Sequence, residues 1–503
     1  MSPRSFAYGE EGTYVDLGLE GSPDRARRTL AAVARHRAAF PNADVVAGAG
    51  VLVVVKASPG EVRALDVATE LAAVPTSGRE HSLRVAYDGE DLAEVAELLG
   101  VSPAEVIHRH TSAAFTAEIL GFLPGFAYLS PVDPAAYRLT VPRRASPRKS
   151  VPRGSVAIAA SFSGIYPFAS PGGWRLLGRL AGASVFDPRR DPPELFAAGD
   201  RVRFVAVEPG EAGRPDVGTG SFEDRPDVGT VGVPALRVVR APACATVQDR
   251  GRQGILGRGY PPSGPLDPET FAAAASAVGN GDDAAAIEIP LGSLEVEARG
   301  SLVLSLDGEP ARTLSDGERF VVPTSGRAVR YLAIRGGLEV PTFLGSRSTL
   351  VPARLGGFLG RPLRRGDLLG IGEAFGSTGR SPPDVSQADP DAPLGILPGP
   401  HLDRFPSGAL DALLAGDWQV SRLSDRVGVR LEGPRIPRDQ PDLGAPVPMI
   451  RGAVEITSDG TPIILGPDHP TTGGYPVLAV LTREAQASLA RLGPGRSLRF
   501  RCV

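Results

Sequence analysis

The chain has 503 residues, of which 42% are hydrophobic and 22% charged, so it is long enough for about three globular domains and is not a disordered polypeptide. A formal charge of −3 gives no general attraction for nucleic acid or anionic lipid, and we expect neither as a partner. The two cysteines, Cys244 and Cys502, form no C-x-x-C motif, which excludes a disulfide framework and a cysteine-rich zinc site.

The cellular compartment follows from the same inventory. Scarce cysteine fits a reducing environment, and the N-terminus lacks the basic and apolar pattern of a secretory signal. The longest apolar run, 45–55, is too short to span a bilayer. We therefore expect a cytoplasmic protein with no membrane partner.

Four stretches are typical of helices. Segments 22–41 and 88–99 place apolar residues at near-helical spacing, and the second is followed by a glycine that stops a helix. Segment 102–109 opens with a capping box, S-P-A-E. Segment 267–279 opens with an aspartate suited to an N-cap and ends at a glycine. These signals predict four short helices.

Most of the remaining chain consists of short β-rich runs, such as LVVVK, LRVAY, VAIAA and VRFVAV, separated by many of the 62 glycines and 49 prolines. This punctuation favours barrels or sandwiches over doubly wound sheets. Residues 209–234 contain RPDVGT twice and show no apolar periodicity. A polar Pro/Gly stretch of this kind predicts a flexible linker between two halves.

Three motifs occur twice in the same order, as GSVAI, PGGW and GDRVRF at 154–158, 171–174 and 199–204, and as GAVEI, TGGY and GRSLRF at 452–456, 472–475 and 495–500. Three ordered matches predict an internal repeat. The glycine pairs are either barrel turns whose aromatic residue fills the core, or exposed N–H groups that hold an anion or an oxyanion. In the second interpretation the candidate substrate-binding residues are Pro171, Gly172, Gly173, Thr472, Gly473 and Gly474.

Several common sites are missing from the sequence. Lys56 and Lys149 are the only lysines and no G-x-x-x-x-G-K-[ST] occurs, which excludes a P-loop. No G-x-S-x-G is present, which argues against an α/β-hydrolase nucleophile. Only His108 and His110 lie close together among six histidines, without acidic or cysteine partners at ligand spacing, so we predict no metal site.

Longer motifs carry a family resemblance. HRHTSAAFTAEILGFLPGFAYLSPVDP and VPRRASPRKSVPRGSVAIAASFSGIYPFASPGGWRLLGR resemble the family of the 5-oxoprolinase B subunit, also described as allophanate hydrolase subunit 1 or a sporulation-kinase inhibitor. VQDRGRQGILGRGYPPSGPLD, AVGNGDDAAAIEI, GSRST, GGFLGR, LSDRVGVRLEG and TTGGYP resemble the family of the 5-oxoprolinase C subunit, described as biotin-dependent carboxyltransferase-like or as allophanate hydrolase subunit 2. The resemblance covers nearly the whole chain and identifies a fusion of the two subunits.

The resemblance implies a mainly β protein with a small α/β portion and internally repeated, cyclophilin-like β-barrels. The expected divisions are a small α/β domain at 1–80, a barrel at 81–208, the linker at 209–234, and a carboxyltransferase-type half at 235–503 in two lobes, about 235–395 and 396–503.

The family has three activities. We expect the chain to be a component of an ATP-dependent 5-oxoprolinase, an amide (lactam) hydrolase that opens 5-oxo-L-proline to L-glutamate together with a larger oxoprolinase/hydantoinase-type subunit that uses ATP. The alternatives are the carboxyltransferase component of a biotin-dependent urea or amide carboxylase, and a histidine-kinase inhibitor. No lysine is flanked by methionines, so no biotin carrier is fused here. We expect no cofactor bound by this chain, ATP through the partner, and biotin only in the carboxylase alternative.

Lactam opening passes through a tetrahedral oxyanion, and the substrate carries a carboxylate, so arginine forks and backbone N–H groups are the expected ligands. Within the family motifs we select His110 as an acid or base facing a cleft, with the alternative that it is a buried histidine at a helix end. The other catalytic candidates are Asp249, for which ion pairing with a flanking arginine is the alternative, and Arg250. The other substrate-binding candidates are Arg252, Arg347 and Glu455, where many relatives carry glutamine; a structural clamp is the alternative for the three arginines.

Overall fold

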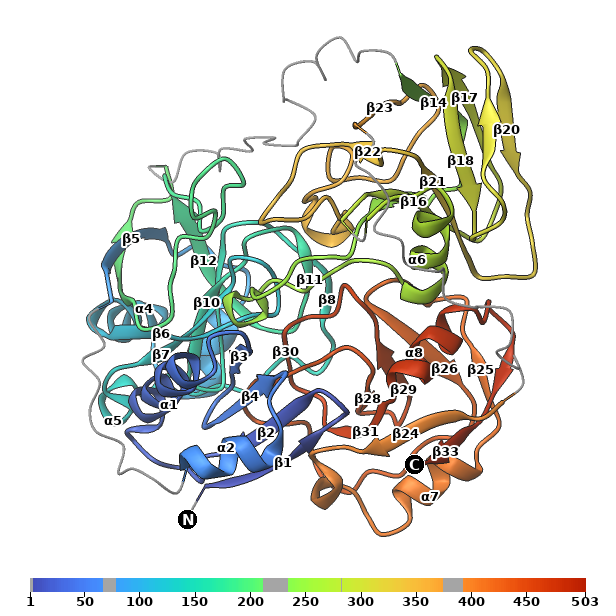
Figure 1. Ribbon diagram of the computed structural model, residues 1–503. Helices are drawn as coiled ribbons and strands as arrows, with labels where there is room; N and C mark the ends of the chain where they lie inside the picture. Colours follow the sequence, from blue (N-terminus) through green and yellow to red (C-terminus); the bar gives the residue numbers. More distant parts are fainter. Residues whose placement is uncertain (1–2, 67–77, 211–233, 282, 374–391) are drawn as a thin grey trace.

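The chain folds into four consecutive units: a small α/β sheet, a closed barrel, a lobe of two sheets and a second barrel (Figure 1). The computed structural model describes residues 3–66, 78–210, 234–281, 283–373 and 392–503. The predicted linker at 209–234 lies almost entirely outside these residues. The mainly β architecture with barrels and a small α/β portion confirms the fold expected from the sequence.

The N-terminal unit is a four-stranded antiparallel sheet in the order β1-β2-β4-β3. Its elements are β1 (Arg4–Tyr8), β2 (Gly12–Asp16), α1 (Arg25–Ala39), β3 (Asp44–Ala47), β4 (Val51–Val55) and α2 (Pro59–Asp66). Because side chains alternate along a strand, Leu52 and Val54 pack in the cluster that contains the helix residues Ala32 and Val33, whereas Val53 belongs to a second cluster. The apolar run of β4 thus covers both faces of the sheet.

The first barrel closes through seven strands in the order β10-β7-β6-β13-β5-β12-β9. Its elements are β5 (Glu80–Ala86), α3 (Leu92–Leu99), α4 (Pro103–Ser112), β6 (Ala114–Leu120), β7 (Ala127–Pro131), α5 (Pro134–Tyr137), β8 (Arg148–Val151), β9 (Ser155–Ala159), β10 (Phe162–Ile165), β11 (Ser170–Gly172), β12 (Arg175–Ala181) and β13 (Arg201–Val207). Gly100 ends α3 in the left-handed conformation with φ 65°, and the Ser102 side chain caps α4 by accepting from the amide of Glu105. Both helices confirm the capping signals.

The middle lobe consists of two five-stranded sheets, β20-β17-β14-β23-β22 and β15-β16-β21-β18-β19. Its elements are β14 (Ala235–Arg240), β15 (Thr246–Gln248), η2 (Leu256–Arg258), α6 (Pro268–Ala277), β16 (Ala286–Pro290), β17 (Leu294–Arg299), β18 (Leu302–Leu306), β19 (Arg312–Leu314), β20 (Arg319–Val322), β21 (Val329–Ile334), β22 (Leu338–Glu339), η3 (Val351–Ala353) and β23 (Leu368–Ile371). Asp267 caps α6 by accepting from the amides of Glu269 and Thr270, as predicted.

The second barrel is an eight-stranded sheet in the order β32-β25-β26-β29-β28-β31-β24-β33. Its elements are β24 (Leu394–Pro398), η4 (Leu402–Arg404), α7 (Ala409–Ala415), β25 (Trp418–Val420), β26 (Gly428–Glu432), β27 (Val447–Pro448), β28 (Ala453–Ile456), β29 (Pro462–Leu465), β30 (Thr472–Gly473), β31 (Val477–Leu481), α8 (Arg483–Ala490), β32 (Ser497–Leu498) and β33 (Phe500–Cys502). Trp418 is fully buried in its core.

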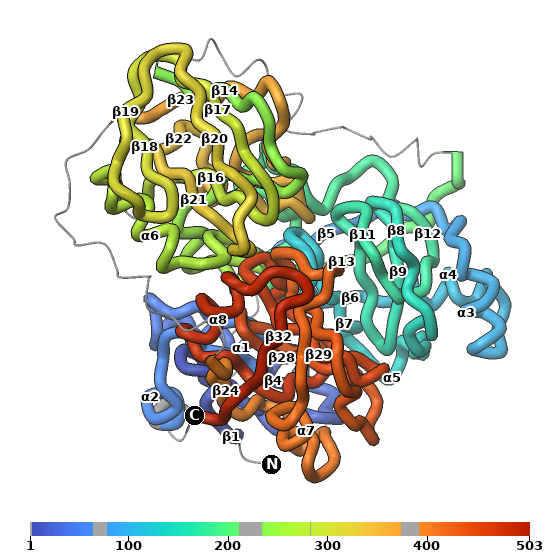
Figure 2. The backbone as a smooth tube through the Cα atoms, turned by 90° about the vertical axis from the view of Figure 1, so that its right-hand side faces the viewer, coloured from blue at the N-terminus to red at the C-terminus, as the bar shows by residue number. Residues whose placement is uncertain are grey.

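The N-terminal sheet lies next to both barrels, shown blue beside the teal and the orange-red units in Figure 1; in the view of Figure 2 the orange-red barrel lies in front of it. Its helix-free face carries Tyr8, Tyr14 and Val53, which form one buried cluster with residues of the second barrel that include Met449 and Val480. On its other side, the Arg25 guanidinium donates to the buried Glu118 carboxylate of the first barrel at 2.8 and 3.1 Å. This sheet therefore holds the two barrels together.

Candidate functional site between the barrels

Each barrel carries a two-stranded ribbon that contains one of the two predicted glycine turns. In the first ribbon β11 pairs with β8, and in the second β30 pairs with β27. The carbonyl of Gly173 accepts from the amide of Arg144 at 2.8 Å, and the carbonyl of Gly474 accepts from the amide of Leu443 at the same distance. The motif repeat found in the sequence is therefore a repeat of the hydrogen-bonded structure.

The glycines allow close packing beneath each ribbon. A Cβ atom at Gly172 would lie 2.3 Å from the Tyr166 hydroxyl, and one at Gly473 would lie 2.5 Å from Cε of Met449. Trp174 is buried and packs edge-on against Phe126, with ring centroids 5.5 Å apart. This packing supports the structural interpretation of the glycines in both turns.

The second turn also lies directly against the first barrel. Oγ1 of Thr472 donates to the hydroxyl of Tyr128 at 3.4 Å, and a Cβ at Gly121 would lie 2.5 Å from the same Oγ1. A Cβ at Gly474 would lie 3.3 Å from both terminal nitrogens of Arg143. Tyr128, Gly121 and Arg143 belong to the first half, so this turn is shared by the two halves.

Arg143 is the cation of this shared site. It is exposed, and within the described part of the chain no hydrogen bond or ion pair joins it to another residue. Burial raises the pKa of Tyr128, Tyr166 and Tyr475, and the charge of Arg143 partly offsets each rise. A guanidinium with free donors beside a glycine turn can hold a carboxylate or a phosphate.

Glu455 on β28 is a titratable group that interacts electrostatically with Tyr475. It is 9% exposed, and burial raises its pKa to about 7, with Arg430 acting against the rise and Asp442 adding to it. Asp442 and Glu455 raise the pKa of Tyr475 while Arg143 lowers it, so Tyr475 lies within reach of charges of both signs. The site combines a free cation with a carboxyl group that changes charge near neutral pH.

The structure corrects the expectation that His110 faces a cleft. Its side chain is fully buried in the first barrel, with Nδ1 2.7 Å from the hydroxyl of Tyr87 and Nε2 2.9 Å from Oγ of Ser163. The ring stacks on Phe204 at a centroid distance of 4.4 Å, and burial lowers its pKa to about 3. Both ring nitrogens are occupied inside the core, which matches the alternative of a buried histidine at a helix end.

Asp249 and Arg347 form a structural junction inside the middle lobe. The Asp249 carboxylate is 4% exposed and accepts from the hydroxyls of Ser346 and Ser348 and from the amides of Gly251 and Arg347 at 2.5–2.9 Å. Nε of Arg347 donates to the carbonyl of Val340 at 3.2 Å. These bonds join the QDRGR and GSRST motifs and do not bring Asp249 to either glycine turn.

The two remaining arginines also have partners. Arg250 pairs with Asp283 at 2.6 Å on the surface. Arg252 is 2% exposed and donates to the hydroxyl of Ser263 and the carbonyl of Ser348 at 3.0 and 2.6 Å, which matches the structural clamp named as its alternative. Sequence reasoning missed Arg143, although it lies in the VPRRASPRKS motif, because nothing in a run of arginines shows which one has no partner.

Metal ligands and membrane helices are both lacking from the described residues. There, no three side chains of histidine, cysteine, aspartate or glutamate gather as metal ligands would. No helix in the same ranges is both long and apolar enough to cross a membrane.

The chain matches two family models. Residues 3–196 match the carboxyltransferase domain, subdomain C and D, and residues 258–502 match the carboxyltransferase domain, subdomain A and B. The chain also aligns with the crystal structure of TTHA0988 at a TM-score of 0.82 and 32% identity, covering 99% of this chain and 100% of that one.

Three named relatives align with parts of the chain. It is 33% identical to the 5-oxoprolinase C subunit of Escherichia coli K12 over 53% of its own length and 90% of that protein. It is 47% identical to the 5-oxoprolinase B subunit of E. coli O157:H7 over 24% of its length and 54% of that protein. Urea amidolyase of Lachancea kluyveri is 31% identical over 53% of this chain but only 17% of that protein.

The chain therefore belongs to the family of carboxyltransferase-domain proteins that includes the 5-oxoprolinase subunits. It joins counterparts of the B and C subunits of 5-oxoprolinase in one polypeptide.

Proposed function

We propose that the chain is a component of an ATP-dependent 5-oxoprolinase and opens 5-oxo-L-proline to L-glutamate together with a larger, ATP-using subunit. The observation that carries this proposal is that one chain contains counterparts of both the B and the C subunits of 5-oxoprolinase. The relatives are named as subunits, which supports the existence of a further partner subunit.

The site between the barrels supports a division of roles in this reaction. ATP held by the larger subunit supplies the activation of the stable lactam carbonyl. In this chain, Arg143, which lies against Gly474 of the second turn, binds the carboxylate of the substrate. Glu455 sets the local charge through its own titration near neutral pH.

The direct test is the release of L-glutamate from 5-oxo-L-proline and ATP, measured with the purified chain alone and with the larger oxoprolinase-type subunit from the same genome. We expect glutamate only in the mixture. A mixture that forms a stable complex but releases no glutamate contradicts the proposal. Conversion of urea with a biotinylated carrier protein would then identify the carboxyltransferase activity to which the urea amidolyase relative points.

The role of Arg143 has its own test within the active mixture. Arg143→Ala is expected to raise KM for 5-oxo-L-proline at least 10-fold because the carboxylate loses its ion-pair partner. Arg365→Ala removes an exposed arginine from the middle lobe and serves as the matched control with unchanged KM. Equal KM values for both variants and the parent would show that Arg143 does not bind the substrate.

A further inference from the structure

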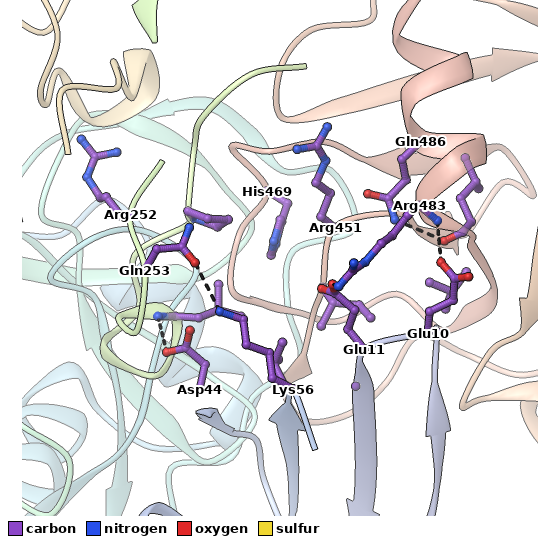
Figure 3. A pocket seen from close by; sticks show the side chains of 18 residues that line it. Glu10, Glu11, Asp44, Lys56, Arg252, Gln253, Arg451, His469, Arg483 and Gln486 are labelled. Carbon is purple, nitrogen blue, oxygen red and sulfur yellow. Dashed lines mark hydrogen bonds and ion pairs between the residues drawn. The ribbon is translucent and has the colours of Figure 1, made fainter. Parts of the chain in front are cut away.

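A cavity lies where the N-terminal sheet meets the second barrel (Figure 3). It has a volume of about 220 Å³ and is lined from both halves of the chain. Its polar lining includes Asp44, Lys56, Gln253, His469, Arg451 and Arg483, with Glu10 and Glu11 beside Arg483. Neither glycine turn lines this cavity, so it is distinct from the site between the barrels.

Lys56 is held at this cavity in a strained conformation. It follows β4 with φ 69°, in the left-handed region that a residue with a Cβ adopts only at an energetic cost. Its Nζ donates to Oε1 of Gln253 at 3.3 Å. Among the described residues no carboxylate forms an ion pair or hydrogen bond with it. Asp44, which lines the same cavity, accepts the amide of Leu256 at 3.0 Å; burial raises the pKa of Asp44, and the charge of Lys56 partly offsets the rise. The ammonium therefore keeps donors for a further acceptor.

His469 presents an acceptor to the same space. Its Nδ1 lies 2.9 Å from the carbonyl of Pro470, and since a carbonyl only accepts, the proton is on Nδ1 and Nε2 keeps its lone pair. Burial lowers the pKa of the ring to about 4, so it is neutral at physiological pH. Figure 3 shows the ring between Gln253 and Lys56 on one side and Arg451 and Arg483 on the other.

The charged side chains of Glu10, Glu11, Arg483 and Arg451 already have hydrogen-bond or ion-pair partners. Oε2 of Glu10 accepts the amide of Arg483 at the start of α8 at 2.6 Å, and Glu11 forms an ion pair with the Arg483 side chain. The guanidinium of Arg451 donates to the carbonyls of Pro265 and Leu266 at 3.1 and 2.6 Å. The ammonium of Lys56 and the acceptor nitrogen of His469 therefore remain available to a ligand.

We propose that this cavity is a binding site for a small carboxylic acid that also carries an N–H group. The carboxylate takes the ammonium of Lys56, and the N–H donates to Nε2 of His469. Amino acids and lactam acids have this pair of groups. The site is argued from its geometry, whereas the choice of 5-oxo-L-proline as first probe rests on the proposed function.

The two lysines of the chain give a direct readout. Reductive methylation with ¹³C-formaldehyde labels Lys56 and Lys149 together with the N-terminal amine, and Lys56→Met identifies its own signal by loss. Titration with 5-oxo-L-proline and, separately, L-proline is expected to move the Lys56 signal to saturation and to leave that of Lys149 in place. Inorganic phosphate, an anion without N–H, is expected to move neither signal.

Variants of the acceptor complete the test in the full chain. His469→Ala is expected to weaken binding at least 10-fold, and His469→Gln, which restores an acceptor oxygen, to recover most of it; Lys149→Met leaves the dissociation constant unchanged. The proposal is overturned if no carboxylic acid moves the Lys56 signal, if both lysine signals move alike, or if phosphate moves the Lys56 signal as strongly. Glutamate release is measured separately, so saturable binding without glutamate release would reject the proposed function and keep the site.

Discussion

At the scale of single residues, Glu455 makes the protein sensitive to pH. Burial raises the pKa of this carboxyl from 4.5 to about 7 in the folded chain. Between pH 4.5 and pH 7 the carboxyl is therefore protonated in the folded state and ionised in the unfolded state. The stability that the group contributes is complete below pH 4.5 and is lost as the pH rises through 7. The difference between the two limits is about 3 kcal/mol.

Replacing Glu455 with glutamine therefore has two expected results. Glu455→Gln stays neutral, so its free energy of unfolding relative to the parent increases between pH 5 and pH 8, as urea titrations at each pH would show.

In the active mixture, KM for the anionic 5-oxo-L-proline rises above pH 7 in the parent, because Glu455 becomes negative, and stays flat in the variant. Parallel KM profiles for the two proteins would place Glu455 away from the substrate.

The left-handed backbone conformation of Lys56 lowers the stability of the folded chain. Glycine at this position removes the left-handed strain of roughly 1–2 kcal/mol and adds an entropy cost of roughly 0.5–1 kcal/mol, so Lys56→Gly is expected to stabilise the chain by about 0.5–1 kcal/mol. Lys56→Ala keeps the Cβ and the strain and is the matched control. Calorimetric melting of both variants checks this, and a lower melting temperature for Lys56→Gly than for Lys56→Ala would refute stored strain.

At the scale of elements, the start of α6 is joined to the end of α8. The Asp267 carboxylate is 1% exposed, caps α6, and accepts two hydrogen bonds from Arg491 at 2.7 and 3.2 Å. Asp267→Ala leaves Arg491 with Glu269 as its remaining partner and is expected to cost about 2–3 kcal/mol, through loss of the cap and of the charged hydrogen bonds. Asp133→Ala removes the same kind of cap from α5 without an ion pair and is expected to cost about 1 kcal/mol. Equal losses in denaturant titrations would show that the cap alone matters.

Elements with local signals were predictable, and side-chain partners distant in the sequence were not. Local signals extend over only a few residues and can be recognised in the sequence, as for the caps at Ser102 and Asp267 and the two glycine turns. The structural role of Asp249 could not be predicted, because three of its four donors come from a segment about 100 residues away. Equally, only the fold shows that Arg143 meets Gly474. The motifs identified the family and the glycine turn of the site. Which charged side chains lack a partner depends on contacts between distant segments, which only the structure shows.

At the scale of the whole molecule, the N-terminal sheet ties the two halves to each other. Its helix-free face, with Tyr8, Tyr14 and Val53, is buried against the second barrel in the cluster described above. Burial of such side chains contributes roughly 1.5–3 kcal/mol each. The relatives named as B and C subunits are separate proteins, so the same contact is expected to act between chains when the linker is cut.

Residues 1–210 produced alone should therefore expose this face, bind the dye ANS and self-associate, and should form a stable complex with residues 234–503 when the two are produced together. Val53→Asp places a charge on the buried face and is expected to abolish the complex in size-exclusion chromatography. Val205→Asp, at a valine that is 46% exposed on β13, is the matched control and should leave the complex intact. A separate 1–210 fragment that stays monomeric without binding ANS would show that the sheet does not need the second barrel. The shared second turn and the Lys56 cavity each contain residues of both halves. In that case the N-terminal half would fold first by itself, and both sites would be completed only when the two halves bind each other.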